Sequence, residues 1–164
     1  MSAQIVADYR ALGAQLATLR RGKSVALANG CFDVLHVGHV RLLREAAGAA
    51  DLLVVALNTD ESVRGNKGKG RPHVPLVERM EVIAALAGVA FVTSFPEPTA
   101  DALIEALKPE VHVKGTDWTA DAVPERAAVE AYGGRILIAG DEKTHSSTGL
   151  IDKLSQDRTP PHRD

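Results

Sequence analysis

A short apolar segment at residues 25–28 leads through a glycine turn to two histidines, His36 and His39, where a helix is expected to begin. Residues three positions apart share one face of a helix. A helix start presents unpaired backbone N–H groups and the positive end of the helix dipole. Two imidazoles at such a terminus predict a phosphate site at the end of a buried strand. The junction therefore favours an α/β fold and points to nucleotide chemistry.

Strand-like and helix-like patterns alternate along the rest of the chain. Residues 52–57 form an unbroken aliphatic run, typical of a strand covered on both faces. Such alternation implies parallel βαβ units with right-handed crossovers. The sequence predicts a Rossmann-like, doubly wound parallel sheet of five strands, with ligands beyond the carboxyl ends of the strands. The expected strands are 25–28, 52–57, 91–94, 111–113 and 135–138, and the expected helices are 8–20, 40–50, 76–86, 100–107, 124–132 and 147–154.

Length, charge and cysteine content exclude several classes of protein. A chain of 164 residues can bury a core as one domain without disulfides or metals. A formal net charge of −2 argues against sequence-independent binding to nucleic acid or to a membrane surface. The single cysteine excludes an internal disulfide and fits a reducing compartment, and no apolar run approaches the roughly 20 residues that span a bilayer. We expect a cytoplasmic protein that binds neither nucleic acid nor membrane.

One domain is expected over residues 1–154, with a leading helix in 1–23 and a motif-bearing core over 25–154. Residues 64–71 hold four cations and three glycines and have no apolar anchor, which predicts a mobile loop. Residues 155–164 are polar and contain two prolines, which predicts a flexible tail.

The segment after the first strand carries a motif. Gly30-Cys31-Phe32-Asp33 is followed by His36, Gly38 and His39, which gives G-x-F-D-x-x-H-x-G-H. This string resembles the signature of the nucleotidyltransferase superfamily that includes the cytidylyltransferases. The resemblance implies that both histidines contact the nucleotide's phosphates and stabilise the charge that builds at the α-phosphorus. It also implies that Gly38 keeps the backbone open to the nucleotide.

Further blocks follow in a fixed order: V-A-L-N-T-D, R-P-x-x-P-L-x-E-R-M, V-K-G-x-D and S-S-T-x-L-I. From about residue 25 to residue 154 the chain resembles the adenylyltransferase domain of the heptose 1-phosphate enzymes that make ADP-heptose for lipopolysaccharide. The resemblance implies transfer of AMP from ATP to D-glycero-β-D-manno-heptose 1-phosphate, with Mg²⁺ arriving on the triphosphate. It also implies a separate sugar kinase, because such enzymes are often fused to one, and a possible homodimer.

Two other interpretations stay open. The glycerol 3-phosphate cytidylyltransferases are similar, but they carry R-T-E-G-I-S-T before the last helix, and residues 141–148 lack that arginine. They have V-M-G-D-D-W where this chain has V-K-G-T-D-W. Lys114 therefore favours the heptose group, whereas Asp117 and Trp118 favour transfer of CMP to glycerol 3-phosphate or another polyol phosphate. The third interpretation is a nucleotide-binding module that has lost turnover.

Several predicted roles have a plain structural alternative. Lys67 and Lys69 are predicted to fold over the triphosphate, although a basic loop is often only solvated. Arg79 is predicted to contact phosphate, and its alternative is a salt bridge. Residues 146–148 are predicted to hold the β- and γ-phosphates from the start of the last helix, and their alternative is a routine N-cap. The predicted catalytic residues are His36, His39, Lys67, Lys69 and Arg79.

The remaining site residues are expected around the base and the acceptor. Gly115 allows backbone contact with the base or ribose, and Asp117 can accept hydrogen bonds. Asp33 is expected to orient a histidine or to touch the acceptor, whereas His112 is expected to be structural. No cluster of side chains predicts a metal site. The nucleotide-binding set is Gly30, Cys31, Phe32, Gly38, Lys114, Gly115, Asp117, Ser146, Ser147 and Thr148, and the acceptor-binding set is Asp33, Asn58 and Trp118.

Overall fold

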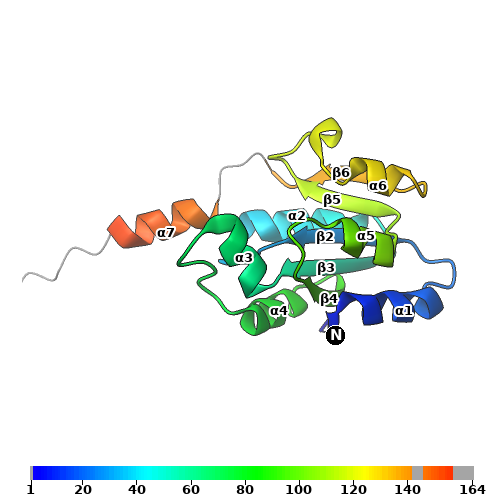
Figure 1. Ribbon diagram of the computed structural model, residues 1–164, viewed down its shortest axis with the longest axis horizontal. Coiled ribbons are helices and arrows are strands. Elements are labelled where there is room, and N and C mark those ends of the chain that lie inside the picture. Colours follow the sequence, from blue (N-terminus) through cyan, green and yellow to red (C-terminus); the bar gives the residue numbers. More distant parts are fainter. Residues whose placement is uncertain (1, 142–145, 157–164) are drawn as a thin grey trace, which may run out of the picture.

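The computed structural model describes residues 2–141 and 146–156, and it contains one six-stranded sheet with helices on both faces (Figure 1). Every pair of neighbouring strands is parallel, in the order β1-β4-β3-β2-β5-β6. The strands are β1 (Gln4–Asp8), β2 (Val25–Gly30), β3 (Leu52–Asn58), β4 (Val89–Phe95), β5 (Val111–Gly115) and β6 (Arg135–Ala139). The helices are α1 (Tyr9–Leu19), α2 (Val37–Gly48), α3 (Asp60–Lys67), α4 (Leu76–Ala84), α5 (Asp101–Leu107), α6 (Arg126–Glu130) and α7 (Ser147–Gln156), with a 3₁₀ turn, η1, at Ala120–Ala122.

The predicted fold class is confirmed, but the sheet has a sixth strand. We expected residues 1–23 to contain only a helix, whereas β1 pairs with β4 at the edge of the sheet. The sequence gives no clear strand pattern here, because four of the five residues of β1 are exposed and only Val6 is partly buried. Asp8 ends the strand and accepts the backbone N–H of Arg10 at 2.9 Å, which caps α1.

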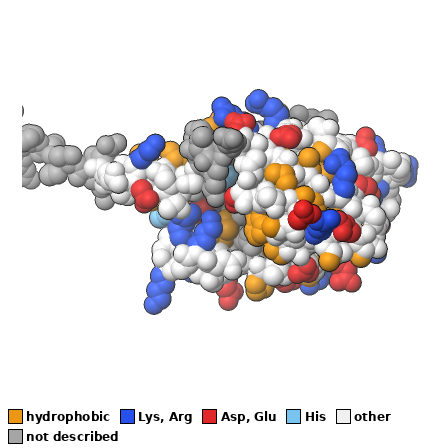
Figure 2. All heavy atoms as spheres, turned by 90° about the horizontal axis from the view of Figure 1, so that it is seen from above, with side chains coloured by type: hydrophobic (Ala, Val, Ile, Leu, Met, Phe, Trp, Pro, Cys, Tyr) orange, Lys and Arg blue, Asp and Glu red, His pale blue; other side chains and the backbone are white. Residues whose placement is uncertain are grey.

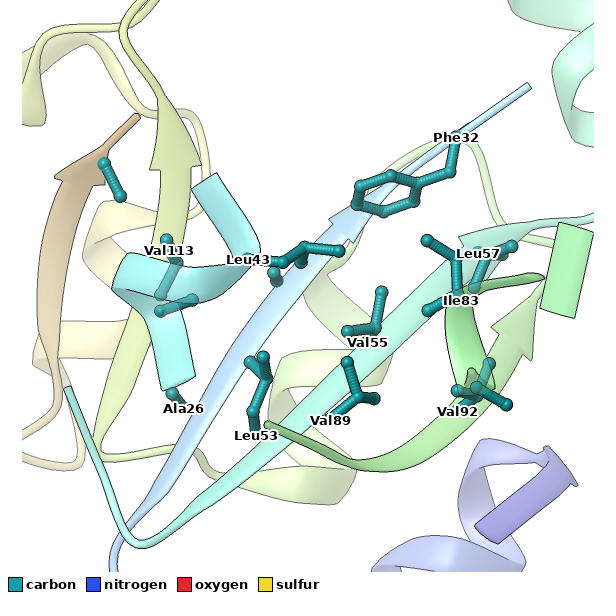
Figure 3. Close-up of a cluster of buried hydrophobic side chains, with 14 of the residues drawn as sticks. Ala26, Phe32, Leu43, Leu53, Val55, Leu57, Ile83, Val89, Val92 and Val113 are labelled. Carbon is teal, nitrogen blue, oxygen red and sulfur yellow. The ribbon is translucent and has the colours of Figure 1, made fainter. Parts of the chain in front are cut away.

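Two apolar clusters lie on opposite faces of the sheet. One contains Leu43 of α2 and Ile83 of α4, packed on the same face as Val55 and Val113 (Figure 3). The other contains residues of α1, α5 and α6, packed on the face that includes Leu27. The aliphatic runs of β2 and β3 are buried throughout because helices cover both faces, as the sequence predicts.

The chain order places the site. From β2 the chain proceeds through β3 to β4 on one side of the sheet, and β5 then returns to the other side of β2. Strand order therefore reverses between β2 and β5. Ligands of open α/β sheets bind at such a point, beyond the carboxyl ends of the strands. Here these ends are Gly30 of β2 and Gly115 of β5.

Helix α3 replaces part of the predicted mobile loop. Residues 64–67 are helical, because Thr59 caps the helix by accepting the N–H of Ser62 at 3.3 Å and Val63 supplies a fully buried anchor. Acidic residues lie in the first turn and basic residues in the last, which complements the helix dipole. The helix ends at Gly68, whose φ of +90° favours glycine.

The last helix stands apart from these layers. Figure 1 shows α7 extending away from the sheet, and none of its residues is buried. Within the described ranges, no helix is long and apolar enough to cross a membrane. Most of the predicted flexible tail, residues 157–164, lies outside the described residues.

Candidate functional site

Two adjoining cavities lie at the carboxyl edge of the sheet. The first has a volume of about 300 Å³ and the second about 210 Å³. The first reaches from the start of α2 to the start of α7, and the second lies between the ends of β2 and β5. The space-filling view in Figure 2 shows Lys and Arg side chains gathered beside the base of α7. Both cavities share His39, Leu42, Lys67, Gly115, Asp117 and Ser147.

The two histidines form a reciprocal cap at the start of α2. The Nδ1 atom of His36 accepts the backbone N–H of Gly38 at 3.2 Å, and the Nδ1 atom of His39 accepts the backbone N–H of His36 at 3.4 Å. Their rings stack with centroids 3.9 Å apart. Since each Nδ1 is an acceptor, a neutral ring carries its proton on Nε2. Both rings can therefore offer an Nε2–H donor at the wall of the first cavity.

His39 is held neutral by its surroundings. Burial, together with smaller contributions from the charges of His36 and Lys67, lowers the pKa of His39 to about 4. Phe32 packs against it with ring centroids 5.2 Å apart. At neutral pH His39 is therefore a hydrogen-bond donor rather than a cation, and the positive charge beside it comes from Lys67.

Two helix starts face the first cavity, at Gly38 of α2 and at Ser146 to Thr148 before and within α7. The Oγ of Ser146 accepts the N–H of Gly149 at 3.0 Å, so the N-cap alternative holds for this hydroxyl. The Oγ of Ser147 donates to the carbonyl of Val34 at 2.9 Å and ties α7 to the loop after β2. The two positive helix ends make this cavity favourable for an anion.

The structure separates the two predicted lysines. Lys67 is the last residue of α3 and lines both cavities. Lys69 follows Gly68, is exposed and lines neither cavity. The helix continues through Lys67 and fixes its backbone, which a mobile loop would not do.

Arg79 lines neither cavity, and the salt-bridge alternative describes its contacts in this structure, whereas its phosphate contact stays a prediction. The residue is 1% exposed, and its side chain is enclosed by acceptors of the protein itself. It forms an ion pair with Asp60 at 2.6 Å. The other hydrogen bonds run from Nε to the carbonyl of Val74, from Nη1 to that of Cys31 and from Nη2 to that of Asn58, at 3.0, 2.6 and 3.0 Å. Arg79 therefore ties the ends of β2 and β3 to the segment before α4.

Asp33 lines the second cavity, but its carboxylate contacts other groups of the protein. Its Oδ1 accepts the backbone N–H groups of His73 and Val74 at 2.8 and 3.0 Å, and its Oδ2 lies 2.8 Å from Nε of Arg71. The side chain is 1% exposed. In this structure Asp33 therefore anchors the segment before α4, and its contact with a histidine or an acceptor stays a prediction.

Asn58 is likewise held by contacts within the protein. It is buried, lines neither cavity and donates from Nδ2 to Oγ of Ser62 at 3.1 Å. The sulfur of Cys31 lies 3.8 Å from its Oδ1. Asn58 therefore connects the end of β3 to α3.

The loop after β5 lies between the two cavities. Lys114 forms an ion pair with Glu125 at 3.1 Å, and its Nζ lies 5.8 Å from the ring centroid of Trp118. A Cβ atom at Gly115 would come within 2.8 Å of Oδ1 of Asp117, so a larger residue would displace that carboxylate. Trp118 is 37% exposed and lines the second cavity. Gly30, Cys31 and Phe32 line the second cavity as well, with Phe32 at a φ of +46°.

Other lining residues were not predicted. Leu42 follows His39 by three positions on α2, so helical spacing could have identified it. Asn29 precedes the glycine turn, and Gly140 and Asp141 follow the end of β6. Thr116 is the variable position of the V-K-G-x-D block. Asp141 is paired with Arg41. Among the described residues no group of three or more His, Cys, Asp or Glu side chains could hold a metal ion.

Comparison with known proteins gives a consistent result. Residues 27–160 match the cytidylyltransferase-like family. The bifunctional protein HldE of Geobacter metallireducens is 46% identical over 134 residues, which cover 82% of this chain and 27% of that protein. HldE of Pseudomonas fluorescens is 43% identical over 80% of this chain. The chain therefore spans about a quarter of the length of these curated relatives.

Solved structures agree in fold. A lipopolysaccharide core biosynthesis protein from Thermoplasma volcanium superposes with a TM-score of 0.61 at 26% identity, covering 71% of this chain and 94% of its own. A pantoate-beta-alanine ligase from Francisella tularensis superposes with a TM-score of 0.58 at 15% identity, over 94% of this chain and 78% of that one. The second similarity concerns the fold alone.

Proposed function

This chain belongs to the cytidylyltransferase-like family and is a nucleotidyltransferase, and we propose that it transfers AMP from ATP to a sugar 1-phosphate. The proposed acceptor is D-glycero-β-D-manno-heptose 1-phosphate, with ADP-heptose and pyrophosphate as products. The similarity to HldE and to a lipopolysaccharide core biosynthesis protein supports this choice. The observation that carries the proposal is the stacked histidine pair, whose Nε2–H donors lie at a helix start beside Lys67.

We propose that the triphosphate lies in the first cavity. The Nε2–H groups of His36 and His39 would donate to the α-phosphate, and Lys67 would screen the charge of the departing pyrophosphate. The start of α7 would receive the β- and γ-phosphates. Charge builds at these oxygens in an in-line displacement, so donors fixed in advance lower the barrier.

The acceptor is proposed to occupy the second cavity. One of its phosphate oxygens attacks the α-phosphorus, the bond from that phosphorus to the bridging oxygen breaks, and pyrophosphate leaves with the electron pair. An acceptor phosphate is already an anion near neutral pH, so the step needs no general base. Neutral His39 fits such a step, because its Nε2–H group can donate a hydrogen bond while the protonation state of the ring stays unchanged.

Mg²⁺ is proposed to arrive with the nucleotide. It needs only one or two carboxylates when phosphates and water supply its other ligands. Asp117 lines both cavities and could provide one carboxylate. The ion would neutralise phosphate charge and orient the triphosphate.

Transfer of CMP to glycerol 3-phosphate or another polyol phosphate is the second candidate. The observation that favours it is the Asp117-Trp118 pair, which lines the second cavity and resembles the cytidylyltransferase sequence. A binding module without turnover is the third candidate. A homodimer and a separate sugar kinase stay predictions.

A grid of nucleotides and acceptors separates these candidates. Pyrophosphate release is measured with ATP, CTP, GTP and UTP, each against heptose 1-phosphate, glycerol 3-phosphate and further sugar phosphates. We expect the fastest release with ATP and heptose 1-phosphate. Fastest release with CTP and a polyol phosphate would favour the second candidate, and nucleotide binding without release under any acceptor would favour the third.

A further inference from the structure

A polar pair lies inside the sheet at the point where strand order reverses. Nε2 of His112 on β5 lies 2.9 Å from Oδ1 of Asn29 on β2. His112 is opposite Leu27 in the β2–β5 register, and Asn29 is two residues further along β2, so all three lie on one face of the sheet. His112 is fully buried, whereas Asn29 is half-buried and lines the second cavity.

The surroundings fix the proton of His112. Burial lowers the pKa of His112 to about 3, with a smaller contribution in the same direction from Lys114, so the ring is neutral at working pH. Its Nδ1 is buried and has no hydrogen-bond partner among the described residues. A buried N–H group without an acceptor is less tolerated than an acceptor without a donor. The proton therefore lies on Nε2 and is donated to Asn29.

This hydrogen bond orients the amide of Asn29. Its oxygen accepts from His112, so the two N–H groups on Nδ2 are directed elsewhere. Nδ2 makes no hydrogen bond to a described residue and is not enclosed by the protein. Lys114, the next position along β5 on the same face, lines the same cavity. This wall of the second cavity therefore presents donors, which suit a ligand rich in oxygen.

We propose that Asn29 donates a hydrogen bond from Nδ2 to an oxygen of the acceptor sugar phosphate, and that His112 is the positioning residue that holds Asn29 in this orientation. The assignment to the acceptor follows from location, because Asn29 lines the second cavity and is absent from the first, where the histidine pair and both helix starts lie. The proposal rests on the proposed function.

The test replaces the donor without changing its shape. Asn29→Asp keeps the oxygen that faces His112 and turns the donor into an anionic acceptor. We expect the KM for heptose 1-phosphate to rise about 10-fold or more, because the variant loses a hydrogen bond to this substrate. The KM for ATP should stay within about twofold, because Asn29 makes no proposed contact with the nucleotide. Asn66→Asp is the matched control, because Asn66 is exposed on α3 and lines neither cavity.

Two variants of His112 test the positioning role and decide the question if Asn29→Asp does not fold. His112→Leu removes the donor to Asn29 and should raise the KM for the acceptor several-fold, whereas His112→Gln supplies an amide N–H and should recover most of the loss. A merely structural role would change the melting temperature and leave the ratio of the two KM values unchanged.

The outcomes separate this proposal from the proposed function. Pyrophosphate release by the wild type with an unchanged acceptor KM in Asn29→Asp would overturn the role of Asn29 alone. A rise in the KM for ATP instead would also overturn it. Absence of release by the wild type with every acceptor would overturn the proposed function and this proposal with it.

Discussion

Replacement of Arg79 by methionine should destabilise the protein without removing a contact to substrate. The guanidinium satisfies three backbone carbonyls and pairs with Asp60 in a fully buried position. Leaving a buried acceptor without its donor costs about 1–3 kcal/mol, so three carbonyls cost about 3–9 kcal/mol. Burial of the methionine side chain offsets about 1.5–3 kcal/mol of this. The difference is a net loss of up to about 7 kcal/mol, and breaking a buried ion pair usually costs about 3–5 kcal/mol, so we expect a loss of about 3–5 kcal/mol.

Such a loss is large beside the total free energy of unfolding, which is about 5–15 kcal/mol for a domain. Urea unfolding of Arg79→Met measures it directly, with Arg64→Met as the matched control because Arg64 is exposed on α3. We expect the control to differ from the wild type by less than about 0.5 kcal/mol. Wild-type stability in Arg79→Met, together with a raised KM for the nucleotide, would refute this reasoning and restore the predicted phosphate contact.

Two further predictions concern charge. Lys67→Ala should lower kcat/KM for the nucleotide about 10- to 100-fold and more than Lys69→Ala does, because only Lys67 lines the cavities; a larger loss with Lys69→Ala would contradict the placement. The pKa values of His39 and His112, about 4 and 3, lie below that of an unfolded histidine, so the unfolded state binds more protons and stability falls as pH drops below about 6.5. Between pH 7 and pH 5 each histidine should lower the free energy of unfolding by about 2 kcal/mol. The variant His112→Leu keeps only the contribution of His39, so its loss over this interval should be about half that of the wild type. An equal loss in wild type and variant, measured by urea unfolding at both pH values, would contradict this prediction.

The part of the fold that the sequence predicted rests on local patterns. The aliphatic runs of β2 and β3 identify buried strands because helices cover both faces. Strand β1 was not predicted because it is an edge strand whose side chains are mostly exposed. Its pairing with β4 depends on tertiary contact. Helix α3 was not predicted because glycines and lysines lie in and just after it, and only a capping threonine and one buried valine indicate a helix.

The residues of the candidate site also differ in how far the local sequence could predict them. The histidine pair was predictable, because its spacing, its glycine and its position after a strand are all local. The roles of Arg79, Asp33 and Asn58 were not, since a motif gives residue type and order but not the direction of a side chain. In the structure these three side chains hold neighbouring segments together, and of the three Asp33 alone lines a cavity. Asn29 belongs to no motif block, and two features of the structure point to it, its place in the second cavity and its partner on β5.

The central claim is that the paired imidazoles at the start of α2 stabilise charge during nucleotidyl transfer. Its most direct test is the rate of pyrophosphate release from ATP and heptose 1-phosphate by the wild type and by His39→Asn, with unfolding measured for both proteins. We predict that kcat falls by about 100-fold or more while the fold is retained, because one donor fixed at a developing oxyanion contributes about that much. A folded His39→Asn variant that turns over at the wild-type rate would contradict the account.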